Sequence, residues 1–260
     1  TNSSLVNSII RKGANLYLPK NFRCKQYTPL SQIELVHRLE TADVIEPVNY
    51  IPKNTFKLFA VAKDNPHDPR CIIDFSPLTP HLDAPKFTLP NVTKLLNSIG
   101  PSDHMIKLDL RNGFFHIPLS HKAQSLIGIK CGSQYYSIKR LPQGLSISPF
   151  LMQQTMLAIF KTLLAHFNVK FLLYLDDLLI YGRKDDLTEC VPSLFASSLE
   201  FNVNKCTLTP TRQLTYLGIE IDLNNETLNL TEAFARKIKN DLLEVKKNVS
   251  HCDISSAWPV

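Results

Sequence analysis

The sequence centres on Phe171-Leu172-Leu173-Tyr174-Leu175-Asp176-Asp177-Leu178-Leu179, in which two adjacent carboxylates interrupt a run of apolar residues. The apolar run resumes through Ile180 and Tyr181 and stops at Gly182. Two β-rich apolar segments that meet at a polar tip predict a tight hairpin with both acids at its turn. A solvated turn explains such a tip when it is considered alone. Adjacent carboxylates repel each other, however, and they are also the ligands that Mg²⁺ takes together with substrate phosphates and water.

The composition is that of an ordinary globular protein. The chain has 260 residues, 44% of them hydrophobic and 20% charged, which is enough for one large domain or two. The formal net charge of +6 mildly favours an anionic partner, and solubility alone would also explain it. The six cysteines include no Cys-x-x-Cys pair, which argues against a zinc site and a disulfide framework and predicts reduced thiols in a cytosol-like compartment. We find no signal-peptide pattern and no apolar run of membrane-spanning length, and we expect the chain to be a piece of a longer protein.

The elements before the central hairpin mix helix and strand patterns. Residues 104–110 predict a half-buried strand, because its apolar residues point one way whereas Lys107 and Asp109 point the other. We expect the other upstream elements in this order: an irregular basic lead-in over 1–26, a helix with a capping box at 31–34 that ends before Asp43, a hairpin of segments 56–62 and 71–75 whose turn carries Lys63 and Arg70, a loop over 76–90, a short helical face over 92–99, and a strand over 134–139.

The strongest helix pattern of the chain begins at Ser148-Pro149. A serine N-cap followed by proline at the first helical position predicts a helix that extends to Ala165. Its expected buried stripe is Met152, Met156, Ile159 and Leu163. After the central hairpin we expect a helix over 187–199, a strand over 201–208 that carries Lys205, a hairpin over 214–230 that turns at Asn224-Asn225, and a last helix over 232–249 with Phe234, Ile238, Leu242, Val245 and Val249 on one face.

Taken in order, the polar positions resemble the motifs of reverse transcriptases, over residues 27–221. The motif order is Lys63/Arg70, Asp109, Phe114, Leu141-Pro142-Gln143-Gly144, Tyr174-Leu175-Asp176-Asp177, Lys205 and Leu217-Gly218. Finer matches resemble the polymerases of hepadnaviruses and of their non-enveloped fish relatives, the nackednaviruses: Lys63-Asp64-Asn65-Pro66-His67, Ile73-Asp74-Phe75-Ser76, Pro85-Lys86-Phe87 with Pro90-Asn91, Phe115-His116-Ile117-Pro118-Leu119 and Ser148-Pro149-Phe150-Leu151. The chain departs from the hepadnavirus pattern at Leu141-Pro142-Gln143-Gly144, which is commoner in retroviruses and long-terminal-repeat retroelements, and in its shorter segment between Gly132 and Leu141.

This resemblance implies an α+β right-hand polymerase with a ferredoxin-like βαββαβ palm. The fingers would comprise residues 1–83 and 117–145, the palm 84–116 and 146–224, and the start of a thumb 225–260. The palm sheet would carry helices on one face and the acids on its open face.

The acids have a physical reason to come together. Two-metal nucleotidyl transfer uses ions about 3.5–4 Å apart, and three carboxylates on adjacent strands are a minimal cage for them. The separation of 67 positions between Asp109 and Asp176 is enough for an intervening strand and helix, although Asp109 by itself would be explained as an exposed strand residue. By resemblance, Asp109 and Asp176 bind two Mg²⁺ ions, with Mn²⁺ as an alternative, assisted by Asp177 and the backbone carbonyl of Leu110.

The resemblance also assigns residues to the incoming nucleotide. Lys63 and Arg70 would hold triphosphate oxygens, although a solvated hairpin turn explains them equally well without the other motifs. Gln143 and Leu175 would contact the nucleotide, and Phe114 would exclude a 2′-hydroxyl by its bulk. An ordinary core aromatic is the alternative for Phe114, and Gly144 would allow either a close backbone approach or a simple turn.

Two further positions concern the leaving group and the primer. Lys205 would lie near the pyrophosphate as a general acid, although a surface lysine fits equally and Glu200 stands where the family often has glycine. The hairpin at Tyr216, Leu217 and Gly218 resembles the primer grip, and it would at the same time be a core hairpin.

The implied function is RNA-directed DNA synthesis in viral genome replication. The expected partners are an RNA template, a DNA primer or RNA–DNA hybrid, and deoxynucleoside triphosphates, with flanking priming and ribonuclease H domains, in the host cytoplasm or within a viral capsid. Template contacts would be electrostatic, through basic residues of the fingers and the last helix. A catalytically silent RNA-binding module and an RNA-dependent RNA polymerase are the alternatives. The retained acid cluster argues against the first, and Phe114 argues against the second.

Overall fold

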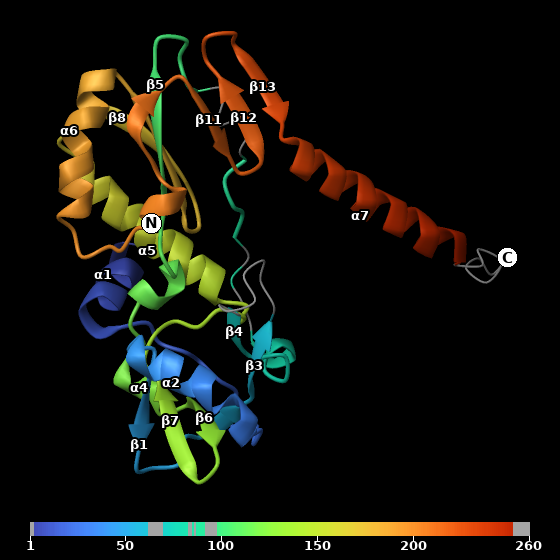
Figure 1. Ribbon diagram of the computed structural model, residues 1–260. Helices are drawn as coiled ribbons and strands as arrows, with labels where there is room; N and C mark the ends of the chain where they lie inside the picture. The colour runs from blue at the N-terminus through green and yellow to red at the C-terminus, as the bar shows by residue number, and fades with distance from the viewer. Residues whose placement is uncertain (1–2, 62–69, 83–84, 86, 92–97, 252–260) are drawn as a thin grey trace, which may run out of the picture.

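The computed structural model describes residues 3–61, 70–82, 85, 87–91 and 98–251. Lys63 and most of the helical face expected over 92–99 lie outside these residues. The described part has two lobes, and the last helix projects away from both (Figure 1).

The lobe drawn at the top of Figure 1 is built on a four-stranded antiparallel sheet. Its chain order is strand, helix, two strands, helix, strand, which is the βαββαβ arrangement predicted for the palm, and its spatial order is β10-β5-β9-β8. The elements are β5 (His104–Asp109), α5 (Ser148–Leu163), β8 (Val169–Tyr174), β9 (Asp177–Gly182), α6 (Lys184–Phe195) and β10 (Thr207–Thr211).

The alternation of β5 decides which side of this sheet is packed. Ile106 and Leu108 are fully buried in the main core, on the side that α5 and α6 cover. Met105 points to the other side, where it joins Leu179 and Tyr216 in a second, smaller core. A short three-stranded sheet contributes to that second core, with the strands β11 (Gln213–Tyr216), β12 (Ile219–Asp222) and β13 (Thr227–Leu230).

The second lobe is inserted between β5 and α5 and is completed by the residues before β5. Its sheet has the order β1-β7-β6-β2, and its two-stranded hairpin β3-β4 matches the predicted one. The elements are α2 (Ile33–Thr41), β1 (Ile45–Val48), β2 (Asn54–Phe56), β3 (Leu58–Val61), β4 (Arg70–Ile73), α4 (His121–Gln124), β6 (Ile127–Cys131) and β7 (Gln134–Ile138).

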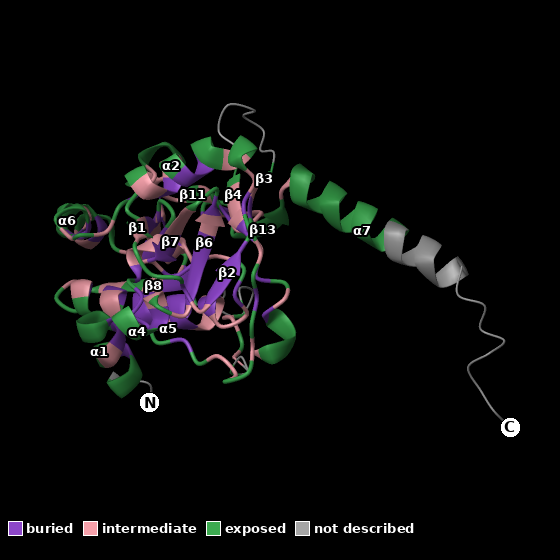
Figure 2. Ribbon diagram, turned by 90° about the horizontal axis from the view of Figure 1, so that it is seen from below, coloured by how far each residue is buried: buried purple, intermediate pink, exposed green. Residues whose placement is uncertain are grey.

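The last helix, α7 (Glu232–His251), makes little packing contact with the two lobes. It projects into solvent in Figures 1 and 2, and the predicted apolar face is exposed at Phe234, Ile238 and Leu242. No helix in the described ranges is both long enough and apolar enough to cross a bilayer.

Two predicted features at the N-terminal side are wrong. The lead-in is not irregular, because Ser3–Lys12 forms helix α1, whose Val6 and Ile9 are buried. The capping box expected at 31–34 does not form, because a 3-10 turn (η1, Leu30–Gln32) precedes α2, and Gln32 at the N-cap makes no side-chain capping bond.

Corrections in the second half concern helix ends and one strand. Ile147 is the N-cap of α5, and the Ser148 hydroxyl instead donates to the Pro142 carbonyl at 2.6 Å. The stripe of α5 is buried at Met152 and Met156 as predicted, whereas Leu151 and Phe160 replace the half-buried Ile159 and Leu163. Lys205 lies in a 3-10 turn (η4, Val203–Lys205) ahead of the strand, because Lys205 and Cys206 bond back to Asn202 and Val203.

Candidate active site

The two acids of the central sequence lie at the predicted hairpin tip. Tyr174 pairs with Asp177, so β8 and β9 are joined by a turn of only two residues, Leu175 and Asp176. Leu175 has φ of +56°, a left-handed conformation that costs an L-residue about 1–2 kcal/mol. The turn therefore needs support from the rest of the fold.

Gln153, which was not among the predicted site residues, supplies that support. This α5 residue is 4% exposed, and its amide donates to the Leu173 carbonyl at 3.0 Å while its oxygen accepts the Leu175 N–H at 2.8 Å. Both ends of the amide are thus used to hold the tip. A glutamine inside the apolar stripe of a buried helix was the available signal, since a buried amide requires partners.

For the polymerase reaction that the sequence predicts, we expect Gln153→Met to lower the rate of nucleotide addition about tenfold, because removing both hydrogen bonds loosens a strained turn that carries Asp176. Single-turnover extension assays would measure this rate, and thermal unfolding would measure the accompanying loss of stability. Lys161→Met, an exposed position on the same helix, is the matched control. An unchanged turnover rate in a destabilised Gln153→Met protein would contradict the positioning role.

The third acid meets the tip from the neighbouring strand. Asp109 and Asp177 are register partners on β5 and β9, and the Leu110 N–H donates to the Asp176 carbonyl at 3.0 Å. Gly113 packs against the same turn, since a Cβ at this position would lie 3.1 Å from the Asp176 Cβ. A side chain there would displace the end of Met152, whose Cε would lie 2.6 Å from such a Cβ, and would crowd the turn. The three acids gather at one end of the sheet as predicted.

Burial and the repulsion between carboxylates act on Asp109 and Asp177 in the same direction. Burial, followed by the charges of Asp176 and Asp109, raises the pKa of Asp177 to about 6. Burial also raises the pKa of Asp109, and Lys205 acts against that shift. Carboxylates that resist ionisation in this way gain from a cation between them.

The predicted cage of three carboxylates is not preformed. Among the described residues, no group of three His, Cys, Asp or Glu side chains converges closely enough to hold a metal ion. Mg²⁺ usually takes one or two protein carboxylates together with substrate phosphates and water. Two facing carboxylates, Asp109 and Asp177, would suit an ion of that kind, for which substrate phosphates would supply further ligands.

This electrostatic situation predicts a pH dependence of stability. In metal-free protein, the folded-state pKa of Asp177 of about 6 exceeds the unfolded value of 3.8, so its contribution to stability is complete below 3.8 and is lost as the pH rises through about 6. We expect the Tm to fall between about pH 4.5 and 7.5, by about 2–6 °C more in the wild type than in Asp177→Asn.

Differential scanning fluorimetry with a chelator, and then with added Mg²⁺, would measure this dependence. Mg²⁺ should raise the Tm at pH 7.5 more in the wild type than in Asp177→Asn, since the ion offsets the repulsion. A Tm difference between the two proteins that does not change with pH would contradict the assignment.

Beside Asp109 lies a short segment that contains the predicted lysine. Lys205 Nζ is 3.9 Å from Asp109 Oδ2, and its side chain is 66% exposed. The Asn202 N–H donates to the Asp109 carbonyl at 2.8 Å, and the Asn202 side chain also hydrogen-bonds the Asp109 carboxylate. Cys206 Sγ accepts the Asp109 N–H at 3.4 Å. The contacts of Asn202 and Cys206 were not predicted, because they depend on the 3-10 turn.

The predicted nucleotide contacts lie on separate elements, and Gln143 lies at a second turn beside Gly144. Gly144 has φ of +96°, and the nearest atom to a Cβ built there is the Ile73 carbonyl oxygen at 3.6 Å. The structure therefore accounts for this glycine by the turn, and the turn lies against the end of β4, whose first residue is the exposed Arg70. Gln143 is half-buried in the same turn. Phe114 lies in a 3-10 turn (η3, Gly113–His116), half-buried against the main core.

The predicted primer-grip hairpin is joined physically to the acids. Leu217 and Gly218 both have positive φ, +50° and +80°, and form the turn between β11 and β12. The buried Tyr216 hydroxyl donates to the Asp177 carbonyl at 3.2 Å. Phe234 of α7 packs on Gly218, where a Cβ would lie 2.8 Å from its Cγ. The hairpin thus links the first turn of α7 to β9.

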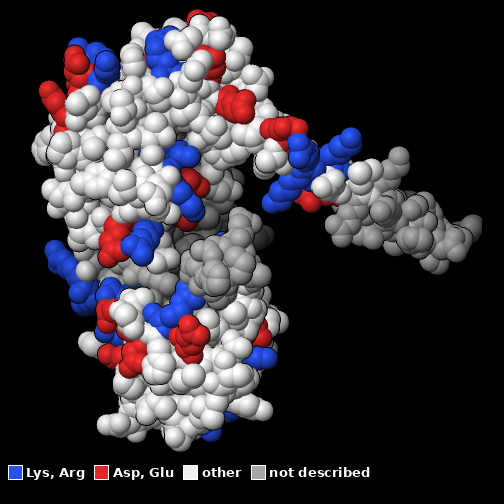
Figure 3. All heavy atoms as spheres, in the orientation of Figure 1, with Lys and Arg blue, Asp and Glu red and all other residues white. Residues whose placement is uncertain are grey.

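The charged surface is mixed on the face that Figure 3 shows. Figure 3 shows acidic and basic side chains interspersed over both lobes, with a basic group on α7, whose members include Arg236, Lys237 and Lys239. In the second lobe, Lys130 Nζ lies 5.4 Å from the ring centroid of Tyr135, beside a hollow of about 350 Å³ that Lys25 and Tyr27 also line. Positive charge interleaved with aromatic rings is the usual surface for unpaired nucleic acid.

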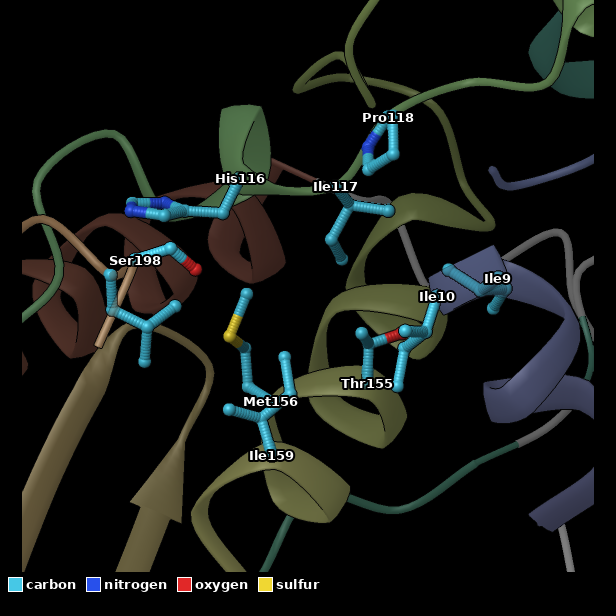
Figure 4. A pocket seen from close by; sticks show the side chains of 10 residues that line it. Ile9, Ile10, His116, Ile117, Pro118, Thr155, Met156, Ile159 and Ser198 are labelled. Atoms are coloured by element: carbon cyan, nitrogen blue, oxygen red, sulfur yellow. The ribbon is translucent and has the colours of Figure 1, made fainter. Parts of the chain in front are cut away.

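Another cavity, of about 240 Å³, lies between α1, η3, α5 and the segment after α6 (Figure 4). It is lined mainly by apolar side chains, including Ile9, Met156 and Ile159, and by His116, whose Nε2 accepts the Glu200 N–H at 2.9 Å. None of the predicted site residues lines it. This cavity is therefore separate from the candidate active site.

Comparison with known proteins gives one family. Residues 46–221 match the family described as reverse transcriptase (RNA-dependent DNA polymerase). Protein P of duck hepatitis B virus (strain United States/DHBV-16) is 27% identical over 202 residues, which are 74% of this chain and 24% of the relative. Protein P of heron hepatitis B virus is likewise 27% identical, over 74% of this chain and 25% of the relative. The retrovirus-related Pol polyprotein from transposon 412 of Drosophila melanogaster is 28% identical, over 76% of this chain and 16% of the relative.

Solved structures agree on the fold. The foamy viral protease-reverse transcriptase in complex with RNA/DNA hybrid matches with a TM-score of 0.66 and 19% identity, over 88% of this chain and 31% of that one. The same protein in complex with dsDNA matches with a TM-score of 0.65, over 89% of this chain and 48% of that one. The chain spans about a quarter of the viral relatives' length.

Proposed function

This chain belongs to the reverse transcriptase family, and we propose that it is the polymerase part of a viral protein that extends a primer with deoxynucleoside triphosphates on an RNA template. The observation that carries this proposal is the meeting of Asp109 and Asp177 as register partners, with Asp176 at the adjoining turn. Burial and mutual repulsion oppose the ionisation of Asp109 and Asp177, and cations bound between the carboxylates would offset that cost.

In this proposal the acids hold two Mg²⁺ ions. When bound, the metals would activate the primer 3′-hydroxyl and stabilise charge on the triphosphate. Asp109 and Asp176 would hold both ions, helped by the Leu110 carbonyl and by Asp177. Gln153 keeps Asp176 in place, and Tyr216 does the same for the backbone of Asp177.

The other residues would bind and orient the substrates. Lys63 and Arg70 would bind the triphosphate oxygens, and Gln143 and Leu175 would contact the nucleotide beside Phe114. Lys205, exposed and close to Asp109, would donate a proton to a pyrophosphate oxygen as it leaves. The backbone of Leu217 and Gly218 would hold the primer end.

The lobes would correspond to the subdomains of a right-hand polymerase. We place the fingers at 1–83 and 117–145, the palm at 84–116 and 146–224, and the start of a thumb at 225–260. The basic and aromatic hollow at Lys25, Tyr27, Lys130 and Tyr135 lies in the fingers and would take unpaired template, and the basic residues of α7 would follow the duplex.

The partners are proposed from the same grounds. The foamy viral enzyme is described in complex with RNA/DNA hybrid and with dsDNA, so this chain would bind an RNA template with its DNA primer. Because the viral relatives are about three times as long as this chain, priming and ribonuclease H domains would flank it in the whole protein. The place of action would be the host cytoplasm or a viral capsid.

Primer extension on an RNA template with Mg²⁺ tests this function. We expect extension with deoxynucleotides and little with ribonucleotides. If the chain alone is inactive, the assay is repeated with the flanking domains present. Absence of extension there, with RNA binding retained, would favour a catalytically silent RNA-binding module.

A further inference from the structure

Lys107 is a charged residue on the working face of the palm sheet that the proposed mechanism does not use. It precedes Asp109 by two residues on β5, so both side chains lie on the same face. Its neighbours in the sheet are the fully buried Leu179 on β9 and the half-buried Thr207 on β10. Lys107 is itself half-buried. Its aliphatic stem is thus flanked by packed strands, and its ammonium group is left for a polar partner.

Lys107 lies between two sets of residues that have proposed roles. On one side are Asp109 and Asp177, and the charge of Lys107 acts on both carboxylates. On the other side is the second core, in which Met105 of β5 packs with Tyr216 of the primer-grip hairpin. The Tyr216 hydroxyl bonds the Asp177 carbonyl at 3.2 Å, so this hairpin and the acids are immediate neighbours. A primer strand that reached from the primer-grip hairpin to Asp109 and Asp177 would pass over Lys107.

Lys107 also lacks a fixed anion. Among the described residues Lys205 approaches Asp109 at 3.9 Å, whereas Lys107 forms no salt bridge. Divalent cations bound to the carboxylates would cancel the attraction between these acids and Lys107. A half-buried ammonium group then requires another negative partner.

We propose that Lys107 binds a backbone phosphate of the primer strand next to its 3′ end. This inference rests on the proposed function and adds a positioning residue to it. The phosphate compensates the charge of Lys107 when the metal sites are filled, and the contact fixes the primer between the acids and the turn at Leu217-Gly218.

The test is equilibrium binding of a fluorescent RNA–DNA primer–template by anisotropy, without nucleotide, over a series of KCl concentrations. Lys107→Met should raise the dissociation constant roughly tenfold at 0.1 M salt and lower the slope of log K against log salt by about one, as expected for one lost phosphate contact. Lys107→Arg should keep the wild-type slope. Lys161→Met, exposed on α5 over the other face of the sheet, should change neither quantity.

Three outcomes would overturn the inference. One is an unchanged slope in Lys107→Met, and another is a rise in the KM for deoxynucleotide without loss of primer–template affinity, which would move the contact to the triphosphate. Wild-type protein that does not bind primer–template would overturn the proposed function itself. Thermal unfolding checks the fold, and Lys107→Gln replaces the methionine variant if the latter does not fold.

Discussion

Asp176→Asn should abolish primer extension, with a loss of at least about 10³-fold in the rate of nucleotide addition, since a metal ion in nucleotidyl transfer supplies several kcal/mol of charge stabilisation. Asp176 occupies the second position of the two-residue turn between β8 and β9. Its backbone is held by the Leu110 N–H, at 3.0 Å from the Asp176 carbonyl. The substitution removes the charge and leaves this backbone geometry in place.

The fold should survive this change. Asparagine is close in shape to aspartate and is accepted in turns. Removing one of three repelling carboxylates should raise the metal-free Tm at neutral pH, because the charge of Asp176 is one cause of the raised pKa of Asp177. Loss of activity together with an equal or higher Tm is a combination that unfolding cannot produce.

Asp185→Asn is the matched control, because Asp185 is an exposed acid in the first turn of α6. It should retain wild-type extension and Tm. Extension by Asp176→Asn within tenfold of the wild type would remove Asp176 from the metal site. The hairpin tip would then be explained as a solvated turn.

Local hydrophobic pattern was sufficient to predict the frame of this site. The period-2 alternation of β5 put Asp109 on the open face, and the apolar runs around Asp176 and Asp177 predicted β8 and β9. The strand and the hairpin depend on neighbours in sequence, so each can be recognised without a partner from elsewhere in the chain. Their assembly into a βαββαβ sheet was expected from the resemblance to reverse transcriptases and not from these patterns.

What supports the frame depends on tertiary contacts and was not predicted. The amide of Gln153 bonds residues 20 and 22 positions away, and Ser148 leaves the expected N-cap to bond Pro142. Asn202 reaches Asp109 because the chain makes a 3-10 turn where the pattern predicted strand. A polar residue has several possible partners of similar energy, and the fold chooses among them.

Phe114→Val should relax the exclusion of ribonucleotides by roughly 10²-fold, the scale on which an apolar wall discriminates a single hydroxyl. Phe114 directly follows Gly113, which packs against the Asp176 Cβ, so the ring begins within one residue of the acid turn. Its half-buried side chain is packed on the main core from one side. Valine would shorten the wall and open space where the 2′-hydroxyl of a ribonucleotide would lie.

Phe115→Val separates this role from packing. Phe115 is also half-buried against the main core and lies in the same 3-10 turn, so both valine variants should lose stability. The ratio of kcat/KM for deoxy- and ribonucleotides should change only in Phe114→Val. An equal effect of the two variants on that ratio would make Phe114 an ordinary core aromatic.

The wild-type ratio of kcat/KM for deoxy- and ribonucleotides also decides which class of polymerase describes the protein. A phenyl ring offers no hydrogen bond to a 2′-hydroxyl, so a protein that uses Phe114 as a wall should select deoxynucleotides by exclusion alone. If the wild type already accepts ribonucleotides as well as deoxynucleotides, Phe114 cannot be that wall, and an RNA-dependent RNA polymerase becomes the better description. If it rejects them and Phe114→Val accepts them, the discrimination resides in the bulk of one side chain next to Asp176.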